Sequence, residues 1–137
     1  MSFVVDASIA GSWLMPDERS AAATQLGRRM LAEGAVTLDL FRHEVRNLLV
    51  MAVQRGRMPE DLLWAQLARI ERMPIRLAPS GPSARIAQRA LTHGLTAYDA
   101  AYLDLALDQA LPLATLDQKL RAAALAEGVT VLPENSP

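Results

Sequence analysis

Short apolar runs alternate along the chain with longer segments in which apolar residues recur every three or four positions. The short runs predict β-strands over 3–5, 35–38, 74–79, 111–115 and 129–132. The longer segments predict helices over 7–15, 18–34, 41–56, 58–73, 83–94, 97–110 and 116–128. Strands that alternate with helices are typical of a parallel sheet covered on both faces. The pattern therefore predicts a three-layer α/β/α fold around a short-stranded parallel sheet.

Glycine, proline and hydroxyl residues mark the ends of several expected helices. Gly34 and Gly94 are stop signals for the helices that precede them. Pro59 is expected in the first turn of the helix over 58–73, and Ser80 or Ser83 is expected to cap the helix over 83–94.

Length and composition indicate one globular domain. The chain has 137 residues, of which 51% are hydrophobic and 4% aromatic, and a chain of this length can bury a sizeable core. We expect a single domain over 1–137 with a loose tail at 133–137. The sequence has no apolar stretch near the ~20 residues that span a bilayer and no secretory leader, so we expect a cytoplasmic protein.

The charged and sulfur-containing residues restrict the possible chemistry. The chain contains no cysteine, which excludes disulfides, Cys-ligated zinc and iron–sulfur clusters. A bound metal would have to be held by oxygen atoms or by the two histidines. The net charge of −1 gives no independent argument for nucleic-acid binding.

Three aspartates occupy positions that helix capping alone could explain. Asp6 directly follows the first predicted strand and could be the N-cap of the next helix. Asp117 follows the strand over 111–115 and could cap the last helix in the same way. Asp99 lies in the first turn of its helix, where a negative charge complements the helix dipole. Taken singly, none of these residues requires a function.

The same aspartates, together with Glu44, are expected at one edge of the sheet. Asp6 and Asp117 follow the carboxyl ends of strands, whereas Glu44 and Asp99 lie in the early turns of helices, which begin at that edge in a parallel α/β sheet. Two carboxylates ~4 Å apart repel by about 4 kcal/mol at an effective dielectric constant near 20. Four of them therefore predict a bound cation, and oxygen ligands without sulfur favour Mg²⁺ or Mn²⁺.

Four segments that contain these acids, "VVDAS", "HEVRN", "LTAYDAAYLDLA" and "LATLDQKL", resemble in order and spacing the PIN domain of VapC-type toxin ribonucleases. The resemblance covers nearly the whole chain. It implies that Asp6, Glu44, Asp99 and Asp117 form the catalytic, metal-binding site of a Mg²⁺- or Mn²⁺-dependent ribonuclease, supported by Asn47 and Thr115. It further implies an RNA substrate, a cognate antitoxin protein and a homodimer.

Four other polar residues stand close to these motifs. Asp39 occupies a turn where PIN-domain relatives usually have proline, and the sequence assigns it no role. Asp104 is turned about 140° from Asp99 around their helix, so we expect it to be exposed. His43 points about 100° away from Glu44, and His93 lies at a helix end. We expect structural roles for both histidines.

Two other functions are compatible with an α/β fold. A phosphoryl-transfer domain of the haloacid dehalogenase type needs a second aspartate two residues after Asp6, where this chain has Ser8. A PIN-like binding module without catalysis would keep the fold but not the reaction.

The helices over 40–73 carry more large apolar residues than one buried face requires, which favours a homodimer or an antitoxin groove.

Overall fold

The computed structural model describes residues 1–134 of the chain, and the expected tail therefore lies mostly outside the described residues. The strands are β1 (Val4–Val5), β2 (Ala35–Thr37), β3 (Ile75–Leu77), β4 (Leu113–Ala114) and β5 (Val131–Leu132). The helices are α1 (Ala7–Leu14), α2 (Ala21–Glu33), α3 (Asp39–Gln54), α4 (Glu60–Glu71), α5 (Ser83–His93), α6 (Ala97–Gln109) and α7 (Gln118–Ala126). Every element predicted from the sequence is present.

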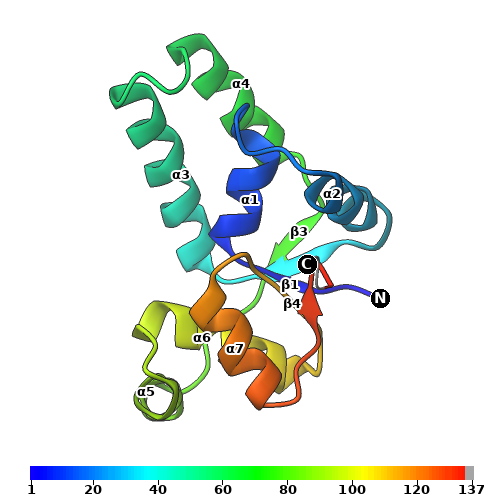
Figure 1. Ribbon diagram of the computed structural model, residues 1–137, viewed down its shortest axis with the longest axis vertical. Helices are drawn as coiled ribbons and strands as arrows, with labels where there is room; N and C mark the ends of the chain where they lie inside the picture. Colours follow the sequence, from blue (N-terminus) through cyan, green and yellow to red (C-terminus); the bar gives the residue numbers. More distant parts are fainter. Residues whose placement is uncertain (135–137) are drawn as a thin grey trace.

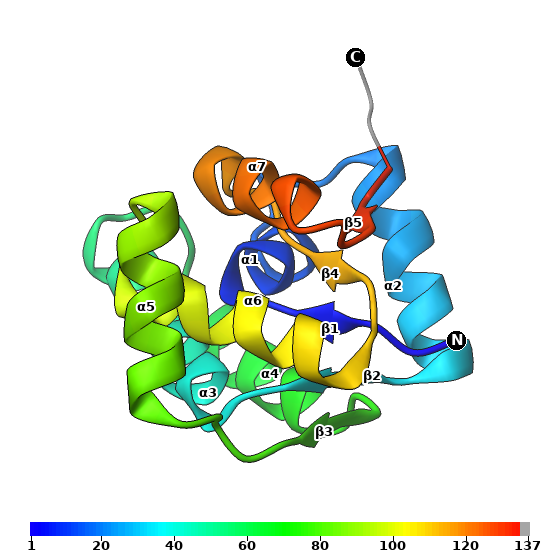
Figure 2. The ribbon, with the colours of Figure 1, turned by 90° about the horizontal axis from the view of Figure 1, so that it is seen from below.

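The five strands form one parallel sheet in the order β3-β2-β1-β4-β5. Helices α1 to α4 lie on one side of the sheet, and α5 to α7 lie on the other (Figures 1 and 2). The predicted three-layer α/β/α architecture is therefore confirmed. The central strands β1 and β4 consist of fully buried residues, as expected for strands covered on both faces.

The chain reverses its direction of travel across the sheet between β1 and β4. From β1 it proceeds through β2 to β3, and it then returns through α5 and α6 to β4 on the other side of β1. Connections leave these two adjacent strands toward opposite faces, which opens a crevice at their carboxyl ends. Asp6 and Asp117 lie at this position.

Several helix boundaries differ from the sequence prediction for local reasons. Ser20 caps α2 by accepting a hydrogen bond from the backbone N–H of Ala23 (3.1 Å), so this helix begins later than expected. The expected cap of α5 by Ser80 or Ser83 is wrong, because Pro82 occupies the cap position. Pro59 likewise precedes the first turn of α4 instead of lying inside it.

Asp104 is buried and not exposed, which corrects the prediction from the sequence. Its side chain is 1% exposed and accepts hydrogen bonds from Arg85 (2.6 and 2.9 Å) and Arg89 (2.8 Å). Helix α5 packs on the outer side of α6, so the α6 face that carries Asp104 is covered by a second helix. A Cβ atom at position 81 would clash with the Asp104 carboxylate, so Gly81 permits this close approach.

The α3–α4 pair confirms the expected excess of apolar residues only in part. Leu48, Met51, Leu67 and Ile70 are partly buried, whereas Trp64 is 58% exposed. No helix within residues 1–134 combines the length and hydropathy needed to cross a bilayer.

We expect Asp104→Asn to lower the free energy of unfolding by roughly 2 kcal/mol, because it weakens hydrogen bonds between charged groups at a buried oxygen. Urea denaturation at pH 7 measures this loss. Asp108→Asn is the matched control, since Asp108 lies 3.7 Å from Arg85 but is 59% exposed and should change stability little. Equal losses in the two variants would contradict a specific role for the buried carboxylate.

Candidate active site

Asp6 lies directly after β1 and is 5% exposed. Its Oδ1 atom accepts hydrogen bonds from the backbone N–H groups of Ser8 (3.1 Å) and Ile9 (3.3 Å), and from the Ser8 hydroxyl (2.6 Å). Asp6 is therefore the N-cap of α1, as one interpretation of the sequence predicted. Its Oδ2 atom accepts a hydrogen bond from Thr115 at the end of β4. Because a carboxylate oxygen has two lone pairs, Oδ2 can accept one further interaction.

Hydroxyl groups connect the ends of β1 and β4. The Ser8 hydroxyl accepts a hydrogen bond from the Leu116 backbone N–H (2.9 Å), and the Thr115 hydroxyl accepts one from the Asp117 backbone N–H (3.1 Å). The Asp117 carboxylate accepts a hydrogen bond from the Leu120 N–H (2.9 Å) and caps α7. These hydrogen bonds fix the two strand ends and their acidic residues relative to one another. The sequence indicated Thr115 as a supporting residue but gave no such role to Ser8.

Glu44 of α3 is connected to α6 through Tyr102. The Tyr102 hydroxyl donates a hydrogen bond of 2.7 Å to Glu44 Oε1, and Tyr102 itself is 1% exposed. The sequence analysis missed Tyr102. Its position three residues after Asp99, on the same face of α6, was the available signal.

The two remaining predicted residues, Asn47 and Asp99, differ in their exposure to solvent. Asn47 is exposed and lines a groove between α1 and α3 together with Ser8, Glu44, Arg55 and Arg57. Asp99 is half-buried, and its backbone N–H donates to the Thr96 hydroxyl that caps α6 (3.1 Å).

The histidines and Asp39 make contacts of their own. His43 lies 3.2 Å from Asp39, and His93 lies 2.6 Å from Glu127. Asp39 is exposed in the first turn of α3. These contacts are the structural roles expected for the two histidines, and the carboxylate of Asp39 has a histidine partner that the sequence did not indicate.

Burial and mutual repulsion raise the pKa values of three carboxyl groups in the site. Burial raises the pKa of Asp6 to about 6, although its hydrogen bonds with Ser8 and Thr115 oppose the shift and the charge of Asp99 adds to it. Burial also raises the pKa of Glu44, with a further contribution from Asp99.

The pKa of Asp99 is raised by burial and by the charge of Asp117. Asp99 thus repels Asp6 and Glu44 and is itself repelled by Asp117. Asp99 therefore lies within electrostatic range of each of the other three predicted acids.

The donor atoms suit a hard cation. Every ionisable group in the site is a carboxyl or phenol, and the neighbouring hydroxyls also present oxygen. Within residues 1–134, no three His, Asp or Glu side chains lie close enough to chelate one ion together. Mg²⁺ is commonly bound through one or two carboxylates and several waters, which is compatible with this wider spacing. A bound cation would also lower the pKa values of Asp6, Glu44 and Asp99, which burial and repulsion raise.

Comparisons with known proteins agree with this arrangement. The PIN domain family profile matches residues 3–126. Ribonuclease VapC3 from Pyrobaculum aerophilum is 35% identical over 123 residues, which cover 88% of this chain and 92% of that protein.

Two solved structures share the fold. The crystal structure of PAE2754 from Pyrobaculum aerophilum superposes with a TM-score of 0.75 at 24% identity, covering 96% of this chain and 90% of the other. The crystal structure of FitAcB from Neisseria gonorrhoeae gives a TM-score of 0.68 at 19% identity, with coverages of 94% and 95%. At these identities, the two structures are evidence for the fold alone.

We expect the stabilisation caused by Asp6→Asn to grow with pH. The pKa of Asp6 is about 6 when folded, against 3.8 for an ordinary aspartate, so the folded state holds this proton more tightly. Wild-type stability should therefore fall as pH rises from about 4 to 6, by up to about 3 kcal/mol for this group. The variant lacks this group, so the difference in unfolding free energy should increase over that window. Urea denaturation in EDTA between pH 4 and 8 measures this difference between variant and wild type. A difference that does not change with pH would contradict the raised pKa of Asp6.

Proposed function

The chain belongs to the PIN domain family, and we propose that it is a Mg²⁺- or Mn²⁺-dependent endoribonuclease of the VapC type. The observation that carries this proposal is that Asp6 and Asp117 follow the two strands at the reversal point and are linked through Thr115, while Asp99 interacts electrostatically with Asp6, Glu44 and Asp117. The relationship with a VapC ribonuclease over most of both chains supports the reaction class.

Asp6, Glu44, Asp99 and Asp117 are proposed to bind the cation, with one or two carboxylates as direct ligands and the others acting through bound water. The chemistry that such an ion supplies when bound is activation of a water and neutralisation of charge on a phosphodiester. Ser8 and Thr115 would keep the Asp6 carboxylate oriented, leaving one lone pair of Oδ2 available. Tyr102 would hold Glu44 through Oε1, so that Oε2 could serve as a ligand of the cation. In the reaction, a water oxygen forms a bond to phosphorus and the leaving oxygen departs with a proton.

The groove beside Glu44 offers a path for the RNA backbone. It runs between α1 and α3 and includes Asn47 on α3 together with Arg55 and Arg57, which follow the end of that helix. Arg57 also pairs with Asp17 (3.1 Å) and Glu18 (2.8 Å). Arginine side chains suit phosphate because their planar donors bind two oxygens at once. An RNA strand bound in this groove would reach the acidic residues while arginine side chains bind its phosphates.

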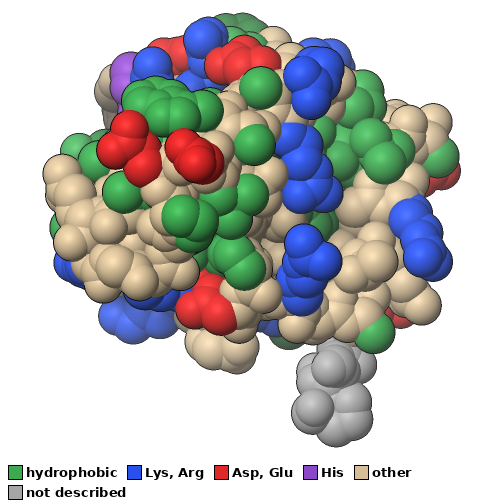
Figure 3. All heavy atoms as spheres, turned by 90° about the horizontal axis from the view of Figure 1, so that it is seen from above, with side chains coloured by type: hydrophobic (Ala, Val, Ile, Leu, Met, Phe, Trp, Pro, Cys, Tyr) green, Lys and Arg blue, Asp and Glu red, His purple; other side chains and the backbone are tan. Residues whose placement is uncertain are grey.

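The biological role that we propose is the toxin of a type II toxin–antitoxin pair, acting in the cytoplasm as a single domain over 1–137. The resemblance to VapC proteins supports a cognate antitoxin and a homodimer. A band of basic side chains runs between apolar patches on the face shown in Figure 3. A groove on this side, between α1, α2 and α4, includes Trp13, Arg28, Leu31 and Arg72. An amphipathic acidic segment of an antitoxin would complement it.

Asp99→Asn should reduce cleavage of a panel of structured RNAs by at least the ~100-fold that loss of an outer-sphere partner can cost a metal site. The assay compares Mn²⁺ with EDTA in protein free of any bound partner. Asp108→Asn on the same helix is the control and should cleave normally, since Asp108 is exposed. Folded wild-type protein that cleaves no RNA would favour the alternative of a binding module without catalysis.

Tyr102→Phe should weaken Mn²⁺ binding by roughly tenfold, the lower end of the loss expected when a residue that hydrogen-bonds to a metal ligand is removed. The hydroxyl group removed by this substitution positions the Glu44 carboxylate (2.7 Å). Isothermal titration calorimetry with Mn²⁺ measures the affinity independently of cleavage. Tyr98→Phe is the control, because Tyr98 is 64% exposed. Unchanged Mn²⁺ affinity in Tyr102→Phe would show that Tyr102 serves packing only.

A further inference from the structure

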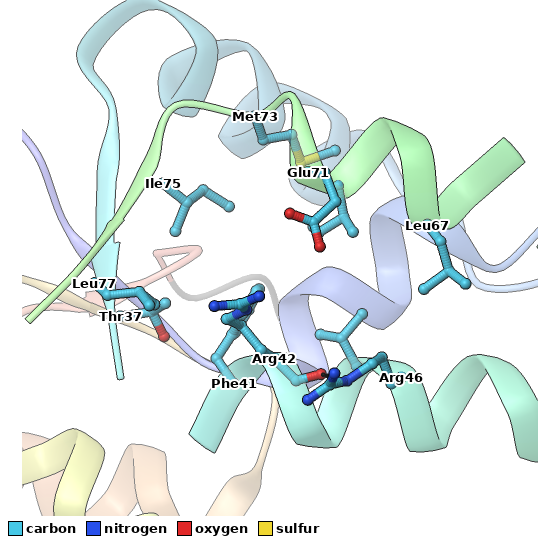
Figure 4. A pocket seen from close by; sticks show the side chains of 11 residues that line it. Thr37, Phe41, Arg42, Arg46, Leu67, Glu71, Met73, Ile75 and Leu77 are labelled. Atoms are coloured by element: carbon cyan, nitrogen blue, oxygen red, sulfur yellow. Dashed lines mark hydrogen bonds between the residues drawn. The ribbon is translucent and has the colours of Figure 1, made fainter. Parts of the chain in front are cut away.

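A second cavity lies on the side of α3 away from the acidic site. It has a volume of about 230 Å³ and is enclosed by α3, α4 and β3 (Figure 4). Arg42 and Arg46, which line it, are about 160° around α3 from Glu44. The apolar lining consists of Phe41, Val45, Leu67, Ile70, Met73, Ile75 and Leu77.

The apolar walls of this cavity are incompletely covered. Phe41 and Val45 form a buried floor, whereas Met73 and Ile75 are only partly buried and Leu77 is 45% exposed. A cavity of this size accommodates a large side chain but is smaller than most sites for drug-sized ligands. The shape therefore favours a side chain that belongs to a longer segment.

Charged groups stand on opposite walls of the cavity. Figure 4 shows Arg42 and Glu71 pointing into it from α3 and α4. Among residues 1–134, no ion pair within 4.0 Å joins Glu71 to either arginine, whereas Arg42 Nη1 lies 3.9 Å from Asp39 Oδ1. Arg46 contacts the carbonyl oxygen of Arg42 (3.2 Å) and His43 Nδ1 (2.9 Å). Arg46 thus places positive charge beside an apolar cavity, where a carboxylate would complement it.

The strand beside the cavity is an edge of the sheet. β3 pairs with β2 on one side and is the outermost strand of the order β3-β2-β1-β4-β5. Ile75 and Leu77 face the cavity, whereas Arg76 lies on the other face and donates to Gln109 (3.1 Å). An outer strand presents backbone N–H and C=O groups that another extended segment can pair with.

We propose that the free edge of β3 and the cavity together form a docking site for an extended acidic segment of a partner protein. The segment pairs with β3 and places a large apolar side chain in the cavity. A carboxylate two residues away, on the same face of the added strand, pairs with Arg46. RNA phosphates could also pair with the arginines, but RNA would neither fill the apolar cavity nor pair with the edge of β3. This site is independent of the proposed nuclease activity.

The test selects ligands from a displayed library of random peptides, each about ten residues long, a strand with short flanks. The full chain is the target. We expect enriched peptides to carry Asp or Glu two positions from a large apolar residue. Fluorescence anisotropy should then show at least about tenfold weaker binding to Arg46→Glu and to Leu77→Asp. Exchanging the acidic residue of the peptide for Lys should restore binding to Arg46→Glu.

Lys119→Glu is the matched control, because Lys119 is exposed on α7, on the opposite side of the sheet from the cavity (Figure 1). It should bind the selected peptides like the wild type. Failure to enrich any peptide, enrichment without acidic residues, or loss of binding in Lys119→Glu alone would overturn the proposal. So would Arg46→Glu losing affinity only for a single-stranded RNA oligonucleotide. If circular dichroism shows Leu77→Asp to be unfolded, the exposed Arg46 variant and its charge-exchanged peptide decide the outcome.

Discussion

The carboxylate of Asp6 joins the two central strands of the sheet, and the rest of the site depends on that connection. It caps α1 on one side and accepts a hydrogen bond from Thr115 beyond β4 on the other. The connections that follow the two strands leave toward opposite faces of the sheet, just beyond the backbone hydrogen bond from the Asp6 N–H to the Ala114 carbonyl oxygen (3.2 Å) (Figure 1). Beyond that bond, the side chains of Asp6, Ser8 and Thr115 supply the connection, and they fix where Asp117 lies.

This connection places a charge in a region that disfavours it. Burial raises the pKa of Asp6 to about 6 even though it accepts hydrogen bonds from Ser8, Ile9 and Thr115. Asp99 adds repulsion to both Asp6 and Glu44. An acid cluster that served capping alone would gain nothing from this repulsion. Electrostatic repulsion between buried acids is typical of functional sites, where a ligand of opposite charge relieves it.

Asp104 shows what the same protein does with a buried acid of structural type. Burial would raise its pKa, but Arg85 and Arg89 outweigh burial and lower the pKa below the ordinary value. Asp104 therefore holds α5 against α6 as a paired carboxylate. Asp6 and Asp104 are about equally buried. Their pKa values shift in opposite directions because two arginines outweigh burial at Asp104, whereas the neutral hydrogen-bond donors around Asp6 do not.

The sequence by itself determined the order of strands and helices, because apolar periodicity and capping residues act over a few neighbours along the chain. It also predicted Asp6, Glu44, Asp99 and Asp117 at one edge of the sheet, since parallel strands place their carboxyl ends together. Only the tertiary structure decided which residues complete the site. Tyr102 contacts Glu44 across two helices that are remote in sequence. Arg85 and Arg89 bind Asp104 on a face of α6 that was expected to meet solvent. Helical periodicity tells which residues share a face, but the neighbour that covers that face is set by packing of the whole chain.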